Sequence, residues 1–172
     1  MFYINPTTDF FISLISFRYS LNKKQYTITY ALLDRILKPL LIQTVDDQLL
    51  LYLSSVGGSG KTYLIKAFIF RLSILEKQDN ILLTASTGAA ATNINSSTYH
   101  SALALYRNQL VGEATKSRLH YKKIFIVDEV SMISFKTLIQ LDKYYNAIWD
   151  SDQENSIFFN SLPIIILLGD FN

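Results

Sequence analysis

Short, nearly continuous runs of apolar residues recur along this chain, separated by longer stretches in which apolar and polar positions mix. Strands that are buried on both faces of a parallel sheet read in this way. The runs are Leu49–Leu53, Ile81–Thr84, Lys123–Val127 and Ile164–Leu168. Small or acidic residues follow each run. We therefore expect four strands of one mainly parallel sheet.

The stretches between these runs have the spacing of helices. After the first strand, apolar positions fall three or four residues apart, at Leu64, Ile65, Phe68, Leu72 and Leu75. Strands that alternate with helices indicate an α/β fold in which helices flank a parallel sheet.

A further helix is predicted ahead of the first strand, over residues 21–37. Asn22 suits the N-cap, apolar residues recur after it, and Pro39 stops the pattern. Asn22 and Gln25 also have the spacing of a capping box, in which each side chain accepts a hydrogen bond from the other residue's backbone amide. The apolar run of residues 10–17 is too short for a membrane span, so we expect a soluble intracellular protein.

Residues suited to chemistry follow each predicted strand. Ligands of open α/β sheets bind at the carboxyl ends of the strands, so these segments are expected to form one site. The segments are Gly57-Gly58-Ser59-Gly60-Lys61-Thr62, Ser86-Thr87-Gly88-Ala89-Ala90-Ala91, Asp128-Glu129 and Gly169-Asp170.

The first segment nearly matches the phosphate loop G-x-x-x-x-G-K-[ST], with Ser55 in place of the first glycine. Its small residues would let backbone amides surround phosphate oxygens at the start of a helix. Lys61 would reach the β- and γ-phosphates, and the Thr62 hydroxyl would bind Mg²⁺. Ser55 would cost about 1–2 kcal/mol if the position needs a positive φ, and almost nothing otherwise. The alternative is a flexible turn with a surface lysine.

The acidic pair after the third strand completes such a site. Asp128 would hold Mg²⁺, usually through water, and Glu129 would orient and deprotonate the attacking water. The alternative is an acidic pair that caps the start of a helix.

The amino-acid composition excludes some other kinds of site. The chain has 172 residues, enough for about one domain, and no cysteine, which excludes disulfides and thiolate metal sites. Two histidines leave little for a zinc site, and a net charge of +2 does not by itself argue for nucleic acid.

The stretches "GGSGKT", "LLTASTGAAATNINSSTYHSAL", "IFIVDEVSMIS" and "PIIILLGDFN" follow one another as in the Pif1-like DNA helicases of superfamily 1, which include the helicase domains of Helitron transposons. The chain resembles this family over residues 21–172. The resemblance implies a RecA-like P-loop NTPase domain, with residues 1–20 as an N-terminal extension. It also implies ATP as substrate, Mg²⁺ as cofactor and ATP-dependent unwinding of DNA in the 5′ to 3′ direction.

The resemblance assigns further residues. Gln25 matches the glutamine that reads adenine, although it also fits the capping box described above. Single-stranded DNA would lie along the segment that follows the second strand, where hydroxyl and backbone donors meet phosphate and an aromatic ring can stack. The matching residues are Thr87, Gly88, Ser97, Thr98, Tyr99 and His100. For Tyr99 and His100, ordinary packing or surface exposure is the alternative.

In the family, "GDFN" continues into a glutamine, a second RecA-like domain and an arginine that completes the ATP site. We therefore expect the first motor domain of a longer helicase, truncated within the GDFN motif, monomeric, able to bind ATP and unable to unwind DNA alone. The family name further suggests roles in DNA repair, recombination and telomere maintenance, and a nuclear location with the mitochondrion as the alternative. The rival hypotheses are a P-loop ATPase that is not a helicase and an inactive relic of a transposon.

Overall fold

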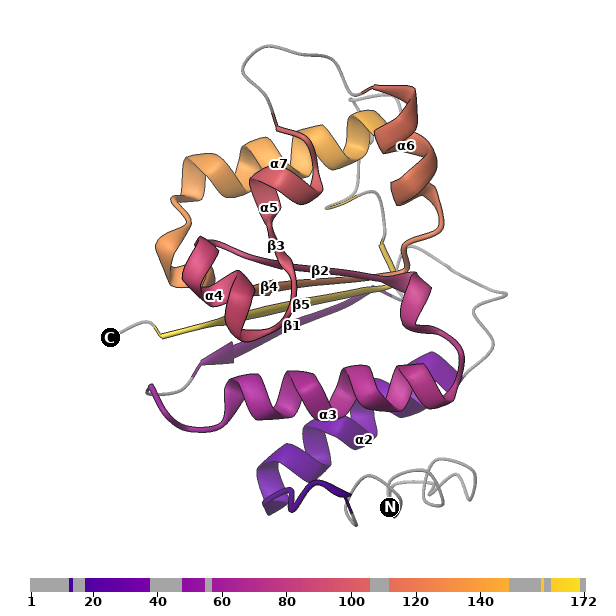
Figure 1. The fold of residues 1–172 in the computed structure, drawn as a ribbon, viewed down its shortest axis with the longest axis vertical. Helices are drawn as coiled ribbons and strands as arrows, with labels where there is room; N and C mark the ends of the chain where they lie inside the picture. Colours follow the sequence, from indigo (N-terminus) through magenta and orange to yellow (C-terminus); the bar gives the residue numbers. More distant parts are fainter. Residues whose placement is uncertain are drawn as a thin grey trace. The chain divides into compact units, whose positions relative to one another are not determined.

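The computed structural model describes residues 13, 18–37, 48–54, 57–105, 112–148, 159 and 162–170 (Figure 1). These residues fall into two compact units. One contains the helices α2 (Lys23–Leu37) and α3 (Lys61–Ile74), and the other contains the strands and the remaining helices. Among the helices of the described ranges, none is long and apolar enough to cross a membrane.

The sheet unit contains five strands in the order β1-β5-β4-β2-β3, and every neighbouring pair is parallel. The strands are β1 (Leu49–Ser54), β2 (Ile81–Ala85), β3 (Ser97–Thr98), β4 (Ile124–Asp128) and β5 (Ile164–Gly169). The predicted parallel α/β sheet is therefore confirmed. Its fifth strand, β3, was not expected, because its two residues are polar and have no apolar pattern.

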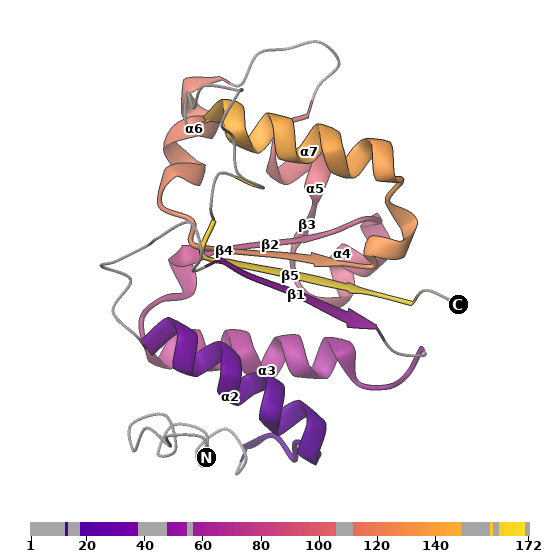
Figure 2. The ribbon, with the colours of Figure 1, turned by 180° about the vertical axis from the view of Figure 1, so that it is seen from behind.

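Helices lie on both faces of this sheet. They are α4 (Gly88–Asn93), α5 (Tyr99–Ala102), α6 (Glu113–His120) and α7 (Phe135–Ile148), together with the short 3₁₀ turns η2 (Gln78–Asn80) and η3 (Val130–Met132). The ribbon shows α5, α6 and α7 on the same side of the strands (Figures 1 and 2). On the opposite face, Ala90, Ala91 and Ile94 of α4 and its C-cap pack against Ala85 of β2.

The core beneath α5, α6 and α7 is apolar and rich in aromatic rings. The ring centroid of Phe125 of β4 lies 6.2 Å from that of Tyr145 of α7 and 5.4 Å from that of Phe159. Leu119 of α6 and Leu103 after α5 are fully buried in the same cluster. Burial of such large side chains contributes about 1.5–3 kcal/mol each, so this cluster holds α5, α6 and α7 on the sheet.

In the helical unit, the predicted capping box is present at the start of α2. The Gln25 backbone amide donates to Asn22 Oδ1, and the Asn22 amide donates to Gln25 Oε1, both at 3.0 Å. Along α3, Leu64, Phe68 and Leu72 are buried at the predicted helical spacing. Arg71 is buried beside them, and desolvation lowers the pKa of its guanidinium to about 10.

Candidate functional site

The four candidate segments lie at or directly after the carboxyl ends of β1, β2, β4 and β5, as the sequence predicted. The end of β2 is joined to the end of β4 by the Ser86 backbone amide, which donates to the Asp128 carbonyl at 3.0 Å. Within β2 and β4, Ala85 is the register partner of Asp128. The parallel sheet therefore brings the turn after β2 beside the acidic pair, although more than 40 residues separate them in the sequence.

The glycine loop connects β1 to α3. Gly58 has φ +79° and Gly60 has φ +90°, a region in which a side chain is strained, so the two glycines are required by the backbone. Gly60 is the N-cap of α3 and offers no side-chain capping bond, so the helix begins with backbone amides that no cap residue occupies. Ser55, the departure from the usual loop pattern, lies outside the described residues.

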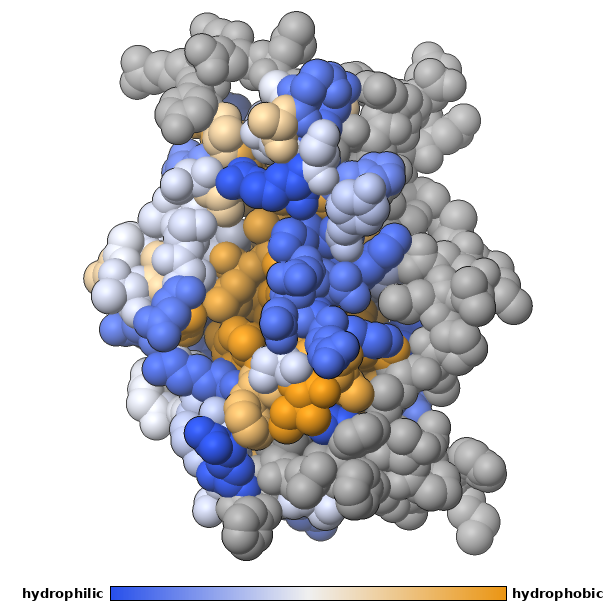
Figure 3. All heavy atoms as spheres, turned by 45° about the vertical axis from the view of Figure 1, so that its right-hand side comes forward, coloured by the Kyte–Doolittle hydropathy of each residue, from blue (hydrophilic) through white to orange (hydrophobic). Residues whose placement is uncertain are grey.

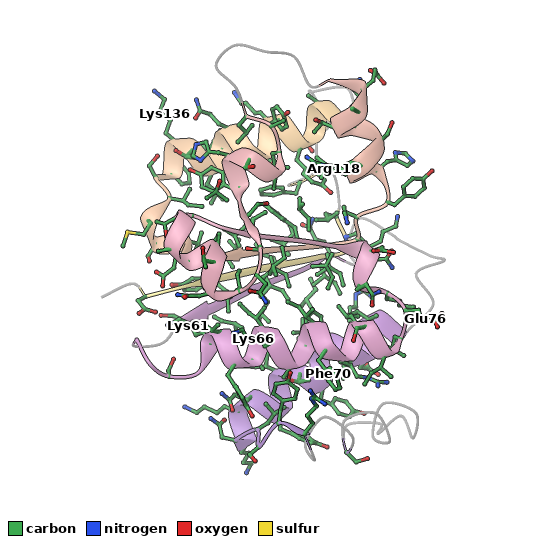
Figure 4. All side chains as sticks on the ribbon, viewed as in Figure 1. Lys61, Lys66, Phe70, Glu76, Arg118 and Lys136 are labelled. Atoms are coloured by element: carbon green, nitrogen blue, oxygen red, sulfur yellow. The ribbon has the colours of Figure 1, made fainter. Side chains whose placement is uncertain are left out.

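Lys61 and Thr62 form the first turn of α3, and both are half-buried. Lys61 is labelled at the start of this helix in Figure 4. This is where a phosphate loop needs its lysine and its hydroxyl. Both residues belong to the helical unit, whereas Asp128 and Glu129 belong to the sheet unit. That Lys61 and Thr62 act on one nucleotide together with Asp128 and Glu129 is therefore part of the proposed function.

Gln25 lies beside the phosphate loop. A Cβ atom added to Gly60 would lie 2.8 Å from Gln25 Nε2, closer than real Cβ contacts. The capping box explains the orientation of the amide, because Oε1 must face the Asn22 amide and this turns Nε2 toward Gly60. The capping alternative is thus present, and it leaves the amide nitrogen directed at the loop.

Asp128 and Glu129 have different environments. Asp128 is the last residue of β4 and is 5% exposed, and its Oδ1 accepts the Glu129 backbone amide at 3.0 Å. This bond fixes the carboxylate at the end of the strand. Glu129 is half-buried and has φ 57° and ψ 40°, a left-handed conformation that costs a non-glycine residue about 1–2 kcal/mol. Such strain is typical of functional positions.

A second acid lies beside the glycine loop. A Cβ added to Gly57 would lie 3.5 Å from Oδ2 of Asp170, which follows β5 directly. Asp170 belongs to one of the four segments that the sequence predicts for the site, although its motif predicts no individual role for it. An acid at the end of a buried strand is the same signal that identified Asp128. Gly169 is also constrained, because its Cβ would lie 3.0 Å from the Ser131 backbone nitrogen and from Val130 Cγ1.

The donors present suit Mg²⁺. The ion binds through one or two carboxylates and substrate phosphates more often than in a cage made by protein alone. In the part of the chain that the structure describes, no three His, Asp or Glu side chains cluster as a ligand set. The Thr62 hydroxyl of the helical unit and the Asp128 carboxylate of the sheet unit are each a hard oxygen donor of the kind that Mg²⁺ binds.

The residues expected to meet single-stranded DNA gather around the end of β2. Thr87 caps α4, and its Oγ1 accepts the Ala90 amide at 3.2 Å. Ser97 and Thr98 form β3, in which Thr98 is the register partner of Ala85. The Thr98 Oγ1 accepts the Ser101 amide at 3.3 Å and so caps α5. A hydroxyl that accepts one bond still has its proton to donate, so both threonines can bind a phosphate oxygen while they cap a helix.

Tyr99 and His100 differ in solvent exposure. Tyr99 is 6% exposed and belongs to the core, so the packing alternative describes its ring. His100 is exposed, and its ring centroid lies 4.0 Å from that of Tyr99. The exposed ring of the pair, on which a base could stack, is therefore that of His100, and the Tyr99 ring contacts it.

The opposite edge of the sheet, where the strands begin, is built from a different set of residues. There Lys122 Nζ donates to the Asp79 carbonyl at 2.7 Å, and desolvation lowers the pKa of this lysine while Asp79 opposes the shift. In the view from this side, hydrophilic residues in blue lie beside apolar residues in orange (Figure 3). The predicted nucleotide and metal residues of the sheet unit, which are Gly57, Gly58, Ser59, Asp128 and Glu129, all lie away from the strand starts.

A family model described as "AAA domain" matches residues 40–172, more than three quarters of the chain. The chain belongs to this family. The resemblance to the Pif1-like helicases is confirmed by sequence as well. The chain is 30% identical over 125 residues to "ATP-dependent DNA helicase RRM3" of Saccharomyces cerevisiae, covering 67% of this chain and 17% of that protein. It is 31% identical over 130 residues to "ATP-dependent DNA helicase Pif1" of a Psychrobacter species, covering 70% of this chain and 19% of that protein.

Solved structures give the same fold. The Pif1 helicase of Candida albicans superimposes with a TM-score of 0.64 at 23% identity, over 88% of this chain and 33% of that chain. A Bacteroides Pif1 bound to single-stranded DNA superimposes with a TM-score of 0.61 at 21% identity, over 87% and 32%. The chain thus spans less than a fifth of the two curated relatives and about a third of these structures.

Proposed function

We propose that residues 21–172 are the first RecA-like motor domain of an ATP-dependent DNA helicase of the Pif1 type, with residues 1–20 as an extension. The observation that carries this proposal is the convergence of segments at the carboxyl edge of one parallel sheet. The glycine loop, the Thr87 turn, the acidic pair and Asp170 all follow strand ends there. The family match and the named relatives, which are ATP-dependent DNA helicases, support the same assignment.

In this proposal the phosphates of ATP bind to the backbone amides of residues 57–62 at the start of α3. Lys61 neutralises the β- and γ-phosphates, and Gln25 Nε2 donates to the adenine. Thr62 and Asp128 hold Mg²⁺, which neutralises charge on the phosphates when it is bound. Glu129 accepts a proton from the attacking water. Its left-handed backbone conformation sets the direction in which its side chain extends from the end of β4.

Single-stranded DNA is the second proposed partner. Thr87, Gly88, Ser97 and Thr98 offer hydroxyl and backbone donors to the phosphates, and the exposed His100 ring offers a stacking surface. The named relatives act on DNA, and a structure with the same fold holds single-stranded DNA. The small net charge of +2 predicts weak, salt-sensitive binding by this chain alone.

The remaining parts of the proposal concern the whole protein. A second RecA-like domain would supply the arginine that completes the ATP site, worth about 10³–10⁵ in rate. We propose that the protein acts as a monomer in the nucleus or the mitochondrion, with 5′ to 3′ polarity. Translocation needs two domains that close around ATP, so we expect no unwinding by the 172-residue chain alone.

The test separates binding, hydrolysis and unwinding. Isothermal titration of the 172-residue chain with a non-hydrolysable ATP analogue and Mg²⁺ should show binding, which an inactive relic would lack. In a longer protein that contains this domain and a second motor domain, single-stranded DNA should stimulate hydrolysis. Strand displacement should then occur on a 5′-tailed duplex and not on a 3′-tailed one. Hydrolysis that DNA does not stimulate would favour an ATPase with another task.

A further inference from the structure

The turn that carries His100 ends in carbonyl groups whose partners lie on two other helices. α5 has only four residues, Tyr99–Ala102, and a helix of this length has too few internal hydrogen bonds to hold itself together. The last carbonyls of any helix need partners from elsewhere. Where these partners come from decides what fixes the position of the turn.

The backbone that follows α5 satisfies the first three of these carbonyls. The Leu103 amide donates to Tyr99 at 3.0 Å, and the Leu105 amide donates to His100 at 2.9 Å. The Ala104 amide donates to Ser101 at 3.2 Å, and Ala104 itself has φ 52°. This reversal is the usual way to end a helix, with a left-handed residue one place beyond the C-cap.

The next two carbonyls are bound by side chains from α6 and α7. Arg118 Nη2 donates to the carbonyl of Ala102, and Tyr144 Oη donates to the carbonyl of Leu103 at 2.5 Å. Figure 4 shows Arg118 extending from α6 toward α5. A cation at the C-terminal end of a helix is favourable, because the last carbonyls carry partial negative charge.

We propose that Arg118 and Tyr144 are positioning residues that hold the α5 turn in the conformation in which Thr98 and His100 meet single-stranded DNA. This inference rests on the proposed DNA-binding role of that turn. Neither residue itself contacts DNA. They act through the carbonyls of Ala102 and Leu103, which lie two and three residues after His100 in the chain.

The α5 turn is held at both of its ends. Tyr99 packs into the core with Leu141 and Tyr145 of α7, and this anchors the start of α5. The clamp of Arg118 and Tyr144 anchors the end. The exposed His100 ring then has only one stacking partner in the described part of the chain, the Tyr99 ring at 4.0 Å. Loosening the end of the turn should therefore move His100 relative to Tyr99.

Arg118→Met and Tyr144→Phe test the clamp, because each keeps the apolar part of the side chain and removes the donor. Tyr121→Phe and Lys136→Met are matched controls. Tyr121 is 72% exposed, and Lys136 is an exposed lysine near the start of α7 (Figure 4), so Lys136→Met loses one positive charge as Arg118→Met does. Arg118→Lys keeps the charge without the planar fork and should restore part of the effect.

The first readout is the NMR signal of the His100 ring in the 172-residue chain. The Tyr99 ring shifts the His100 ring protons from their free values, and both clamp variants should move these signals toward the free values. The controls should not. A His100 signal that is unchanged in both Arg118→Met and Tyr144→Phe overturns the proposal, whatever the result with DNA.

The second readout is affinity for a fluorescent oligothymidine at low salt, with the affinity for the MgATP analogue measured beside it. We expect DNA binding to weaken about three- to tenfold in each clamp variant, as for the loss of one hydrogen bond, with nucleotide binding unchanged. Tyr144→Phe removes no charge, so its salt dependence should equal that of the wild type. An equal loss of DNA and nucleotide binding would show general unfolding and overturn the positioning role.

The two proposals fail in different ways. If the wild-type chain does not bind the oligonucleotide at all, the DNA-binding function fails, and a moved His100 signal still supports the clamp as a positioning device. If the wild type binds and both clamp variants bind as tightly, the positioning role is wrong and the DNA-binding function stands.

Discussion

Gln25 Nε2 occupies the space in which a side chain at Gly60 would lie, so that a Cβ there would come within 2.8 Å of the amide nitrogen. A glutamine side chain is flexible, and in other circumstances it would simply move away. Here its Oε1 is held by the Asn22 amide, so a shift of the amide breaks the capping box of α2. The start of α2 and the phosphate loop are thereby coupled through one side chain.

Gly60→Ala should destabilise the protein for two reasons. The left-handed φ of +90° costs alanine about 1–2 kcal/mol, and the new Cβ displaces Gln25. In a Gln25→Ala background only the first cost remains. Urea unfolding of the four proteins should therefore give a coupling free energy of about 0.5–3 kcal/mol. Strictly additive effects would mean that Gln25 moves aside without cost.

Lys61→Ala should abolish binding of the MgATP analogue with little change in thermal stability. Lys61 is half-buried at the start of α3, and its charge contributes to the ligand, since the core residues of this helix begin at Leu64. Lys66→Ala, which removes an exposed lysine further along the same helix, is the control and should bind normally. Unchanged affinity of Lys61→Ala in isothermal titration would show that the loop does not bind phosphate.

Substitutions at Glu129 should separate turnover from folding. In a longer protein with both motor domains, Glu129→Gln should bind ATP and lose about 10²–10⁴ in turnover, because the amide cannot accept the proton. Glu129→Gly should lose turnover as well, yet it relieves the left-handed strain and should raise the free energy of unfolding by up to about 1 kcal/mol. Normal turnover by Glu129→Gln would assign the base to another residue.

Stability should fall at high pH because of two buried tyrosines. Burial raises the pKa of Tyr99 and of Tyr144 above 10, and the nearby Arg118 partly opposes the shift at Tyr144. Above pH 10 the unfolded chain loses these protons while the native protein keeps them, so the free energy of unfolding decreases as the pH rises. Below pH 10 both states are protonated and this contribution is constant.

Urea unfolding between pH 8 and pH 11 measures this effect, and Tyr144→Phe should show a smaller decrease than the wild type. The comparison with the variant is needed because Arg71 acts in the opposite direction. Its pKa is lowered to about 10 in the native protein, so its contribution to stability increases as the pH rises above about 10. Parallel curves for wild type and Tyr144→Phe would mean that Tyr144 titrates normally.

The sequence by itself determined the parallel α/β sheet and the order of the candidate segments. The four predicted strands appear within about one residue of their expected ends, because continuous apolar runs are long enough to identify buried strands without other information. The capping box of Asn22 and Gln25 is also a local signal, complete within four residues. The glycine loop could be predicted for the same reason, because the glycines that its backbone conformation requires lie close together in the sequence.

Only the tertiary structure decided which of these segments meet. Local spacing does not contain the strand order β1-β5-β4-β2-β3, and it is this order that places Ser86 beside Asp128 and Asp170 beside Gly57. The two polar residues of β3 became a strand because β2 offered an edge, and nothing in their own pattern favours one. The burial of Tyr99 and the exposure of His100 likewise depend on α7, which packs on one ring and leaves the other in solvent.

Arg118 and Tyr144 show most clearly which contacts cannot be predicted from the sequence. Each reads in the sequence as an ordinary polar position on a helix, and neither belongs to a motif. Their donors meet the carbonyls of Ala102 and Leu103 only because α6 and α7 pack over α5. A hydrogen bond between residues 16 or 41 positions apart leaves no periodic trace in a sequence, because it is fixed by the packing of whole helices and not by the backbone nearby.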